Sequence, residues 1–239
     1  MSGHSHFKTI KAQKGIADAK RGNLFSKMAK VIAIAAKTGP DPITNAKLKV
    51  AIEQAKSVNM PKENIERAIK KGTGELAGES LTEVVFEGFG PGGAAIIIEG
   101  ITDNTNRTIG EIKQILNQNN GKLAGEGAVR WMFERKGIIS TTIAPDANKE
   151  QLEMTAIEGG ADDIYLHENV LDIYTKPGEL ENIKKNLEAK NVKIESSILG
   201  WVAKEMVEID EKTKESCQKL FEALDENDAV QEIYSNIKD

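Results

Sequence analysis

The sequence predicts an α+β protein of several domains, with an N-terminal three-helix bundle followed by two α+β domains, the third inserted into the second. Three observations lead to this prediction. Apolar residues recur at helical spacing through the first 75 positions, a strand-rich pattern begins near residue 80, and the elements expected over residues 137–202 follow the order β-α-β-β-α-β. That order is the one found in ferredoxin-like domains.

The first predicted domain covers residues 1–75. Three segments there carry apolar residues at helical spacing, namely 18–37, 45–58 and 61–71. Thr44 or Asn45 can cap the second helix, because short polar side chains accept hydrogen bonds from the first turn. Pro61 suits the first position of the third helix, and Gly72 is expected to end it.

The second predicted domain is discontinuous and covers residues 80–134 and 204–239. Its first part is expected to contain strands at 82–89, 94–101 and 128–134 and a helix at 106–119. The run Gly90-Pro91-Gly92-Gly93 joins two β-rich runs, which predicts a hairpin, and Asn104 is placed to cap the helix.

The third predicted domain covers residues 135–203. It is expected to contain strands at 137–143, 163–167, 170–175 and 192–199 and helices at 148–158 and 178–189. The tail then predicts a strand at 206–210, a helix at 212–225 and a strand at 229–234. These last 34 residues are too few to bury a core alone, so they should pack on the second domain, which makes the third an insertion.

Charge is divided unevenly along the 239 residues. Residues 1–72 hold fifteen Lys and Arg against five Asp and Glu, a net charge of +10, while the remainder holds seventeen against thirty-two, a net charge of −15. A cationic segment attracts polyanions, and the anionic remainder restricts which end of the protein docks on them. The alternative is a solvated helical surface that happens to be rich in lysine.

Several classes of protein are disfavoured. No run approaches the roughly 18 consecutive apolar residues that cross a bilayer. A single cysteine, Cys217, with His4, His6 and His167 supports neither a disulfide nor the usual structural zinc site. No Ser-His-Asp or Cys-His pairing is suggested. We therefore expect a cytoplasmic protein that is not an enzyme, with no cofactor, metal, membrane or small-molecule substrate.

The predicted nucleic-acid-binding residues are basic positions of the first domain. They are Lys8, Lys11, Lys14, Lys20, Arg21, Lys27, Lys62, Arg67, Lys70 and Lys71. Arg67, Lys70 and Lys71 are spaced i, i+3, i+4 and so share one helix face. Phe7 is a candidate for stacking on an exposed base, the alternative being a disordered terminus. Arg107 could also contact a phosphate.

Several motifs together resemble the YebC/PmpR family, whose mitochondrial relative is the translational activator of cytochrome c oxidase subunit I. The motifs span the chain: GHS at 3–5, DAKRG at 18–22, NMPKENIERAIKKGTGE at 59–75, EGFGPGG at 87–93, TDNTNRT at 102–108, FERKG at 133–137 and ALDENDAVQEIYSN at 223–236. The resemblance implies a helical bundle followed by two α+β domains, the last inserted into the middle one.

The resemblance also implies function. It implies a transcriptional regulator that binds DNA, or alternatively a ribosome-associated factor that binds ribosomal or transfer RNA and relieves stalling on proline-rich sequences. His6 and Phe7 stand where the family usually has Lys-Trp, which lowers the charge of the N-terminal arm. The chain begins at the motif without an Arg-rich extension, which favours the bacterial cytoplasmic form.

Overall fold

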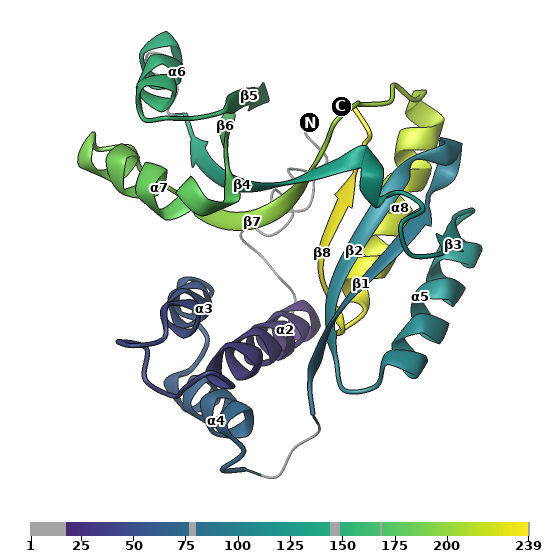
Figure 1. The fold of residues 1–239 in the computed structure, drawn as a ribbon. Coiled ribbons are helices and arrows are strands. Elements are labelled where there is room, and N and C mark those ends of the chain that lie inside the picture. The colour runs from purple at the N-terminus through teal and green to yellow at the C-terminus, as the bar shows by residue number, and fades with distance from the viewer. Residues whose placement is uncertain (1–17, 77–79, 144–148, 168, 239) are drawn as a thin grey trace. The chain divides into compact units, whose positions relative to one another are not determined.

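The computed structural model describes residues 18–76, 80–143, 149–167 and 169–238. These residues form seven α-helices and two four-stranded sheets (Figure 1). They fall into two compact units. The first unit takes the residues up to Val129 together with Ile209–Ile233, and the second takes Arg130–Glu208 and the C-terminal residues from Tyr234.

The first unit begins with three helices. They are α2 (Asp18–Ala36), α3 (Ala46–Ser57) and α4 (Lys62–Thr73). Apolar side chains from all three form one core, which includes Ile32 of α2, Leu48 of α3 and Ile65 of α4. The three predicted helices are confirmed, with ends that differ from prediction by one or two residues.

Asn45 caps α3 and also fixes the loop that precedes it. Its side-chain oxygen accepts a hydrogen bond from the Leu48 N–H at 3.0 Å. Its amide nitrogen donates to the carbonyl oxygens of Ala35 and Gly39, each at 2.8 Å. One buried side chain thus satisfies main-chain groups at the end of α2 and at the start of α3.

The prediction that Gly72 ends the third helix is wrong. Gly72 lies inside α4, and Gly74, with a φ of 82°, is the left-handed residue that caps it. A Cβ atom on Gly72 would lie 2.2 Å from the carbonyl oxygen of Ala33 on α2. Glycine is therefore present because two helices approach closely there, not because the helix turns. Pro61 likewise precedes the helix instead of opening it.

The first sheet has the strand order β3-β1-β2-β8. Its strands are β1 (Thr82–Phe89), β2 (Ala95–Thr102), β3 (Lys122–Ala124) and β8 (Val230–Ser235). β1 and β2 form the predicted antiparallel hairpin, and Gly92 and Gly93 adopt positive φ in the 3-10 turn Pro91–Gly93 between them.

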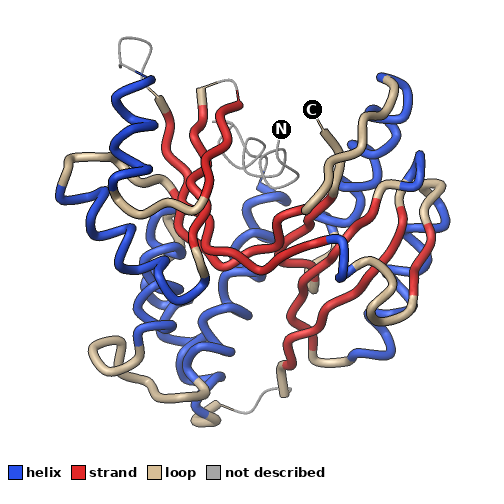
Figure 2. Tube along the Cα trace, turned by 45° about the horizontal axis from the view of Figure 1, so that its top comes forward, coloured by secondary structure: helices blue, strands red, loops and turns tan. Residues whose placement is uncertain are grey.

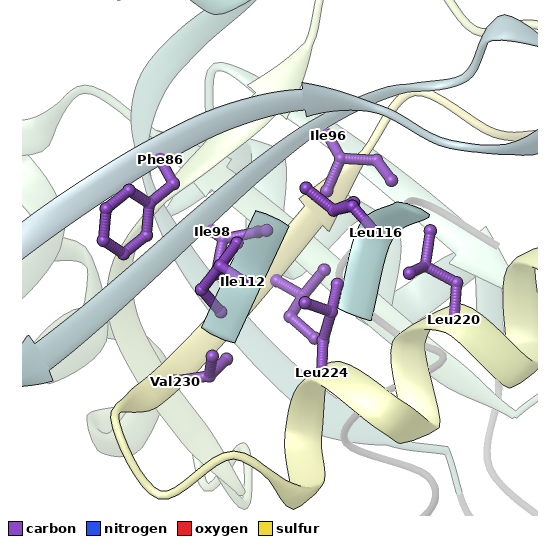
Figure 3. Packing of buried hydrophobic residues seen from close by; sticks show 9 residues of the cluster. Phe86, Ile96, Ile98, Ile112, Leu116, Leu220, Leu224 and Val230 are labelled. Carbon is purple, nitrogen blue, oxygen red and sulfur yellow. The ribbon is translucent and has the colours of Figure 1, made fainter. Parts of the chain in front are cut away.

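Two helices pack against this sheet, α5 (Thr105–Gln118) and α8 (Glu211–Glu226). Figure 3 shows Ile112 and Leu116 of α5 and Leu220 and Leu224 of α8 in one core with Ile96 and Ile98 of β2. The predicted cap of α5 is confirmed, because the Asn104 side chain accepts a hydrogen bond from the Arg107 N–H at 3.1 Å.

Two predicted strands around this sheet are wrong. The expected strand at 128–134 is divided: Arg130–Met132 is a 3-10 turn, and Phe133 begins the first strand of the second sheet. The buried carboxylate of Glu87 accepts hydrogen bonds from the N–H groups of Gly127, just before this run, and of Val129, within it, each at 2.8 Å, so the Val129 N–H is not available for strand pairing. The expected strand at 206–210 makes only one isolated bridge, Val207 to Ile237.

The second sheet lies in the second unit and has the strand order β5-β6-β4-β7. Its strands are β4 (Phe133–Thr142), β5 (Asp163–His167), β6 (Val170–Thr175) and β7 (Ser196–Ala203). All three pairings are antiparallel. The unit also contains the helices α6 (Lys149–Glu158) and α7 (Leu180–Ala189), and α7 follows the 3-10 turn Pro177–Glu179. The elements therefore follow the predicted order β-α-β-β-α-β (Figure 2, strands red and helices blue).

The last strand of this sheet starts later than predicted. It was expected at 192–199, whereas β7 begins at Ser196. Val192 and Ile194 instead pack against the core beneath the sheet, and the Lys193 carbonyl accepts a hydrogen bond from the Thr141 hydroxyl at 2.8 Å. The boundaries proposed for three domains, near residues 75, 134 and 203, stay a prediction.

Candidate nucleic-acid interface

The exposed face of α4 carries three cations. Arg67, Lys70 and Lys71 are all exposed, whereas Ile65 and Ala68 on the same helix are buried in the bundle core. Burial of the apolar positions fixes the rotation of the helix about its axis, so the basic side chains face outward. The structure therefore brings the three residues together as their spacing predicted.

Lys62 lies on the same helix but in a different electrostatic environment. Its ammonium lies 3.5 Å from the carboxylate of Glu66, one turn further along. An exposed pair of this kind contributes little to stability, but it partly cancels the charge that an approaching anion would meet. We expect Lys62 to attract a phosphate less strongly than Arg67, Lys70 or Lys71.

A groove of about 1050 Å³ adjoins this face within the first unit. Its cationic lining residues are Lys30, Lys37, Arg67, Lys71 and Arg107. The carboxylates in its lining are those of Asp103 and Asp228. The groove therefore has an excess of positive charge, and it continues the cationic surface of α4 toward the N-terminal end of α5.

Three of the lining cations are held by neighbouring groups. The Lys30 ammonium lies 2.8 Å from the Asp228 carboxylate, and the Lys37 ammonium donates to the Leu81 carbonyl at 2.6 Å. The Arg107 guanidinium donates to the Asp103 carboxylate at 2.5 Å, and this hydrogen bond raises the pKa of Arg107. These cations are preorganised, while their partners offset part of their charge.

Lys27 does not belong to this surface. It was predicted to bind nucleic acid, but it is 3% exposed and forms an ion pair with Asp225 near the end of α8. Its ammonium also donates to the Asp225 carbonyl at 2.6 Å, and the Asn23 amide donates to the Glu226 carbonyl at 3.1 Å. The last carbonyls of a helix lack hydrogen-bond donors within the helix, and here side chains of α2 supply donors to the last carbonyls of α8. We therefore leave Lys27 out of the candidate interface.

The remaining predicted residues lie at or beyond the start of α2. Lys8, Lys11, Lys14 and Phe7 are outside the described residues, and the Lys20 side chain is not described. Arg21 is exposed in the first turns of α2. The binding roles of these residues stay predictions.

Lys30 and Lys37 were not predicted as binding residues, although both line the groove. Their separation of seven residues places them on one side of a helix, and this spacing was the available signal. The sequence could not show that this side of α2 faces a groove, because the groove depends on tertiary packing. Among the described residues, no helix is long and apolar enough to cross a membrane.

Comparison with known proteins identifies the family. Residues 5–75 match the family domain described as the TACO1/YebC protein N-terminal domain, and residues 81–237 match the TACO1/YebC second and third domain. The chain belongs to the TACO1/YebC family.

Relatives of this TACO1/YebC protein are similar over nearly their full length. A probable transcriptional regulatory protein of Geobacter sulfurreducens is 45% identical, over 99% of this chain and 95% of the relative. One of the same description from Caldanaerobacter subterraneus is 44% identical, over 100% and 98%. The crystal structure of a conserved hypothetical protein from Aquifex aeolicus superposes with a TM-score of 0.87 at 46% identity, covering 96% of this chain and 95% of that one.

Proposed function

We propose that this TACO1/YebC-family protein is a non-enzymatic cytoplasmic regulator of transcription that binds DNA through the cationic face of α4 and the adjoining groove. The observation that carries the proposal is the exposure of Arg67, Lys70 and Lys71 on one face of a helix whose opposite side is buried. Such an array neutralises phosphates and releases counterions, which supplies affinity for a polyanion. The names of the curated relatives support a role in transcription.

A second candidate function is translation, with ribosomal or transfer RNA as the partner. It is favoured by the composition of the exposed α4 surface, where Lys, Arg and Glu predominate. Lysine and arginine contacts to phosphates position a protein on a nucleic acid but carry no base sequence information. Recognition by backbone and shape is the usual way in which proteins bind double-helical RNA.

The proposal is tested by reversing charge on α4 in the full-length protein. The variant combines Arg67→Glu, Lys70→Glu and Lys71→Glu, and binding to a fluorescent DNA duplex is followed by anisotropy at about 0.05 to 0.2 M salt. We expect affinity to fall at least about tenfold, because three phosphate contacts become repulsive.

A matched control reverses three exposed lysines on other helices, namely Lys113 of α5, Lys185 of α7 and Lys219 of α8. It makes the same change in net charge at different places. If both triple variants lose affinity equally, binding reflects net charge alone and the proposed interface is wrong.

The two candidate partners are distinguished in cells. Crosslinking followed by sequencing of the attached nucleic acid should recover promoter DNA if the protein regulates transcription, and ribosomal or transfer RNA if it acts in translation.

A DNA footprint that disappears at about 0.2 M salt with competitor DNA would contradict specific regulation of transcription. Co-sedimentation with ribosomes that is lost in the α4 variant would support the second candidate.

A further inference from the structure

The second unit presents an exposed tryptophan. Trp131 is 67% exposed and lies in the 3-10 turn Arg130–Met132, directly before β4. Tryptophan usually buries most of its large ring, and exposed indoles often mark surfaces that bind a partner. The core of the second unit and the candidate interface on α4 leave this side chain unexplained.

The turn that carries Trp131 is anchored at several points. The Lys204 ammonium donates to the Trp131 carbonyl at 2.8 Å, and the Lys204 N–H donates to the Met132 carbonyl at 2.9 Å. The next residue, Phe133, is buried and pairs with Ala203 at the end of β7. The backbone beneath the indole is therefore held in place while the ring remains accessible.

Arginine side chains lie over a second tryptophan in the same region. The guanidinium carbon of Arg135 lies 5.1 Å from the ring centroid of Trp201, and that of Arg130 lies 5.9 Å from it. Arg135 and Trp201 occupy paired positions on β4 and β7. Cation–π contacts of this kind help to hold guanidinium groups in place.

The charge of this region differs from that of its surroundings. Residues 130–208 hold ten Lys and Arg against fifteen Asp and Glu. Residues 130–136 and 201–205 hold four of the basic residues (Arg130, Arg135, Lys136 and Lys204) and only two acidic ones (Glu134 and Glu205). These two segments thus hold more basic than acidic residues within an acidic unit, which favours an anionic partner. The Lys136 ammonium lies 3.8 Å from the Glu134 carboxylate and 3.9 Å from that of Asp162, so we leave it out of the proposed site.

We propose that Trp131, with Arg130, Arg135 and Lys204, binds an unpaired nucleotide of a single-stranded nucleic acid. The base stacks on the exposed indole, and the cations attract the adjoining phosphates. An aromatic platform combined with basic side chains is the arrangement with which proteins bind single strands. A base within a duplex is already stacked on both faces, so this site discriminates against duplexes. The inference rests on the proposed function only in that the protein binds nucleic acid.

The test uses full-length protein and a 2-aminopurine-labelled single-stranded oligonucleotide of mixed sequence, with a duplex of the same sequence as the reference. Trp131→Ala should weaken single-strand binding at least about fivefold, the loss expected for one base–aromatic stack, and Trp131→Phe should restore most of it. Duplex binding should change less than twofold. In a Trp201→Phe background the oligonucleotide should quench the fluorescence of Trp131.

Three results would overturn the proposal. In the first, the Trp131→Ala variant binds single strands as tightly as the unmodified protein does, or the only binding that it loses is to a protein partner. In the second, single-strand and duplex binding fall together, which would make Trp131 a structural residue. In the third, the unmodified protein binds no nucleic acid, and the proposed function fails as well. In the first two results the unmodified protein still binds duplex DNA, and in the third it does not, so failure of this inference and failure of the proposed function are distinguishable.

Discussion

The buried ammonium of Lys27 on α2 contacts both the carboxylate and the main-chain carbonyl of Asp225 at the end of α8. The pair joins elements 198 residues apart in the sequence. The two partners differ in exposure, because the side chain of Lys27 is 4% exposed and that of Asp225 is 33% exposed. This difference predicts which of the two residues the fold tolerates losing.

Asp225→Asn should destabilise the protein more than Lys27→Met. The first change removes the charge of the Asp225 carboxylate from beside a buried ammonium, and we expect it to cost about 2–3 kcal/mol. The second removes the buried charge, keeps a side chain of similar length, and leaves a carboxylate that water can partly solvate, so we expect about 1 kcal/mol. Urea unfolding of the two variants measures the difference, and the reverse order would contradict it.

Lys27→Met should also leave binding to nucleic acid unchanged within about twofold, because its charge is not on the surface. The anisotropy assay described above tests this expectation. A large loss of affinity in a folded Lys27→Met protein would return Lys27 to the binding surface.

Gly72→Ala should destabilise the bundle more than Gly74→Ala. A Cβ atom on Gly72 would lie 2.2 Å from the Ala33 carbonyl and 2.8 Å from the Ala36 Cβ, so α2 and α4 must move apart. We expect this overpacking to cost about 2–3 kcal/mol. At Gly74 no atom lies within 4 Å of the added carbon, and the cost of about 1 kcal/mol comes from its left-handed backbone alone. Thermal unfolding of both variants gives the comparison; equal losses would argue against a close helix crossing.

Cys217 should react slowly with thiol reagents in the folded protein. Burial raises the pKa of its thiol from an ordinary value of 9.0 to about 11. The reactive thiolate is then scarce at neutral pH, and burial further restricts access, so we expect at least a roughly hundredfold slower reaction than in urea. Aromatic disulfide reagents followed by absorbance measure both rates, and comparable rates would show that the thiol is accessible.

The same pKa shift makes stability depend on alkaline pH. The unfolded chain ionises Cys217 near pH 9, whereas the folded chain does so only near pH 11. The contribution of the neutral thiol is therefore fully present below about pH 9 and is lost progressively as pH rises toward 11. Cys217→Ala should show less of this alkaline loss in urea unfolding at pH 8 and pH 10, whereas an identical loss would assign the effect to other groups.

Neutralising the α4 surface should reduce the salt dependence of binding. Converting Arg67, Lys70 and Lys71 to Gln removes three phosphate contacts, which should lower the slope of log affinity against log salt by about 3 on duplex DNA and about 2 on single strands. Lys62→Gln should lower it by less, because Glu66 already lies 3.5 Å from that ammonium. An unchanged slope in the triple variant would show that α4 does not contact phosphates.

The helices and the hairpin were predictable because their signals are local. Apolar spacing located α2, α3 and α4. Asn104 was recognised as a cap, and the cap of α3 was narrowed to Thr44 or Asn45, because a cap depends on its immediate neighbours; the structure shows that it is Asn45. The strand boundaries were less certain. The run at 128–134 has strand-forming composition, yet the Glu87 carboxylate, about forty residues earlier, accepts hydrogen bonds from the N–H groups of Val129 within the run and Gly127 just before it, and the chain turns.

The sequence alone determined the features that depend on residues close together in the chain. These are the positions of the helices, the clustering of Arg67, Lys70 and Lys71 on one helix face, and the motifs of the TACO1/YebC family. Only the tertiary structure decided which cations are available. Lys27 and Lys70 are equally basic in sequence, but Lys27 is buried against Asp225 and Lys70 faces solvent. Burial depends on segments distant in the chain, because each side chain is covered or exposed by what packs against it.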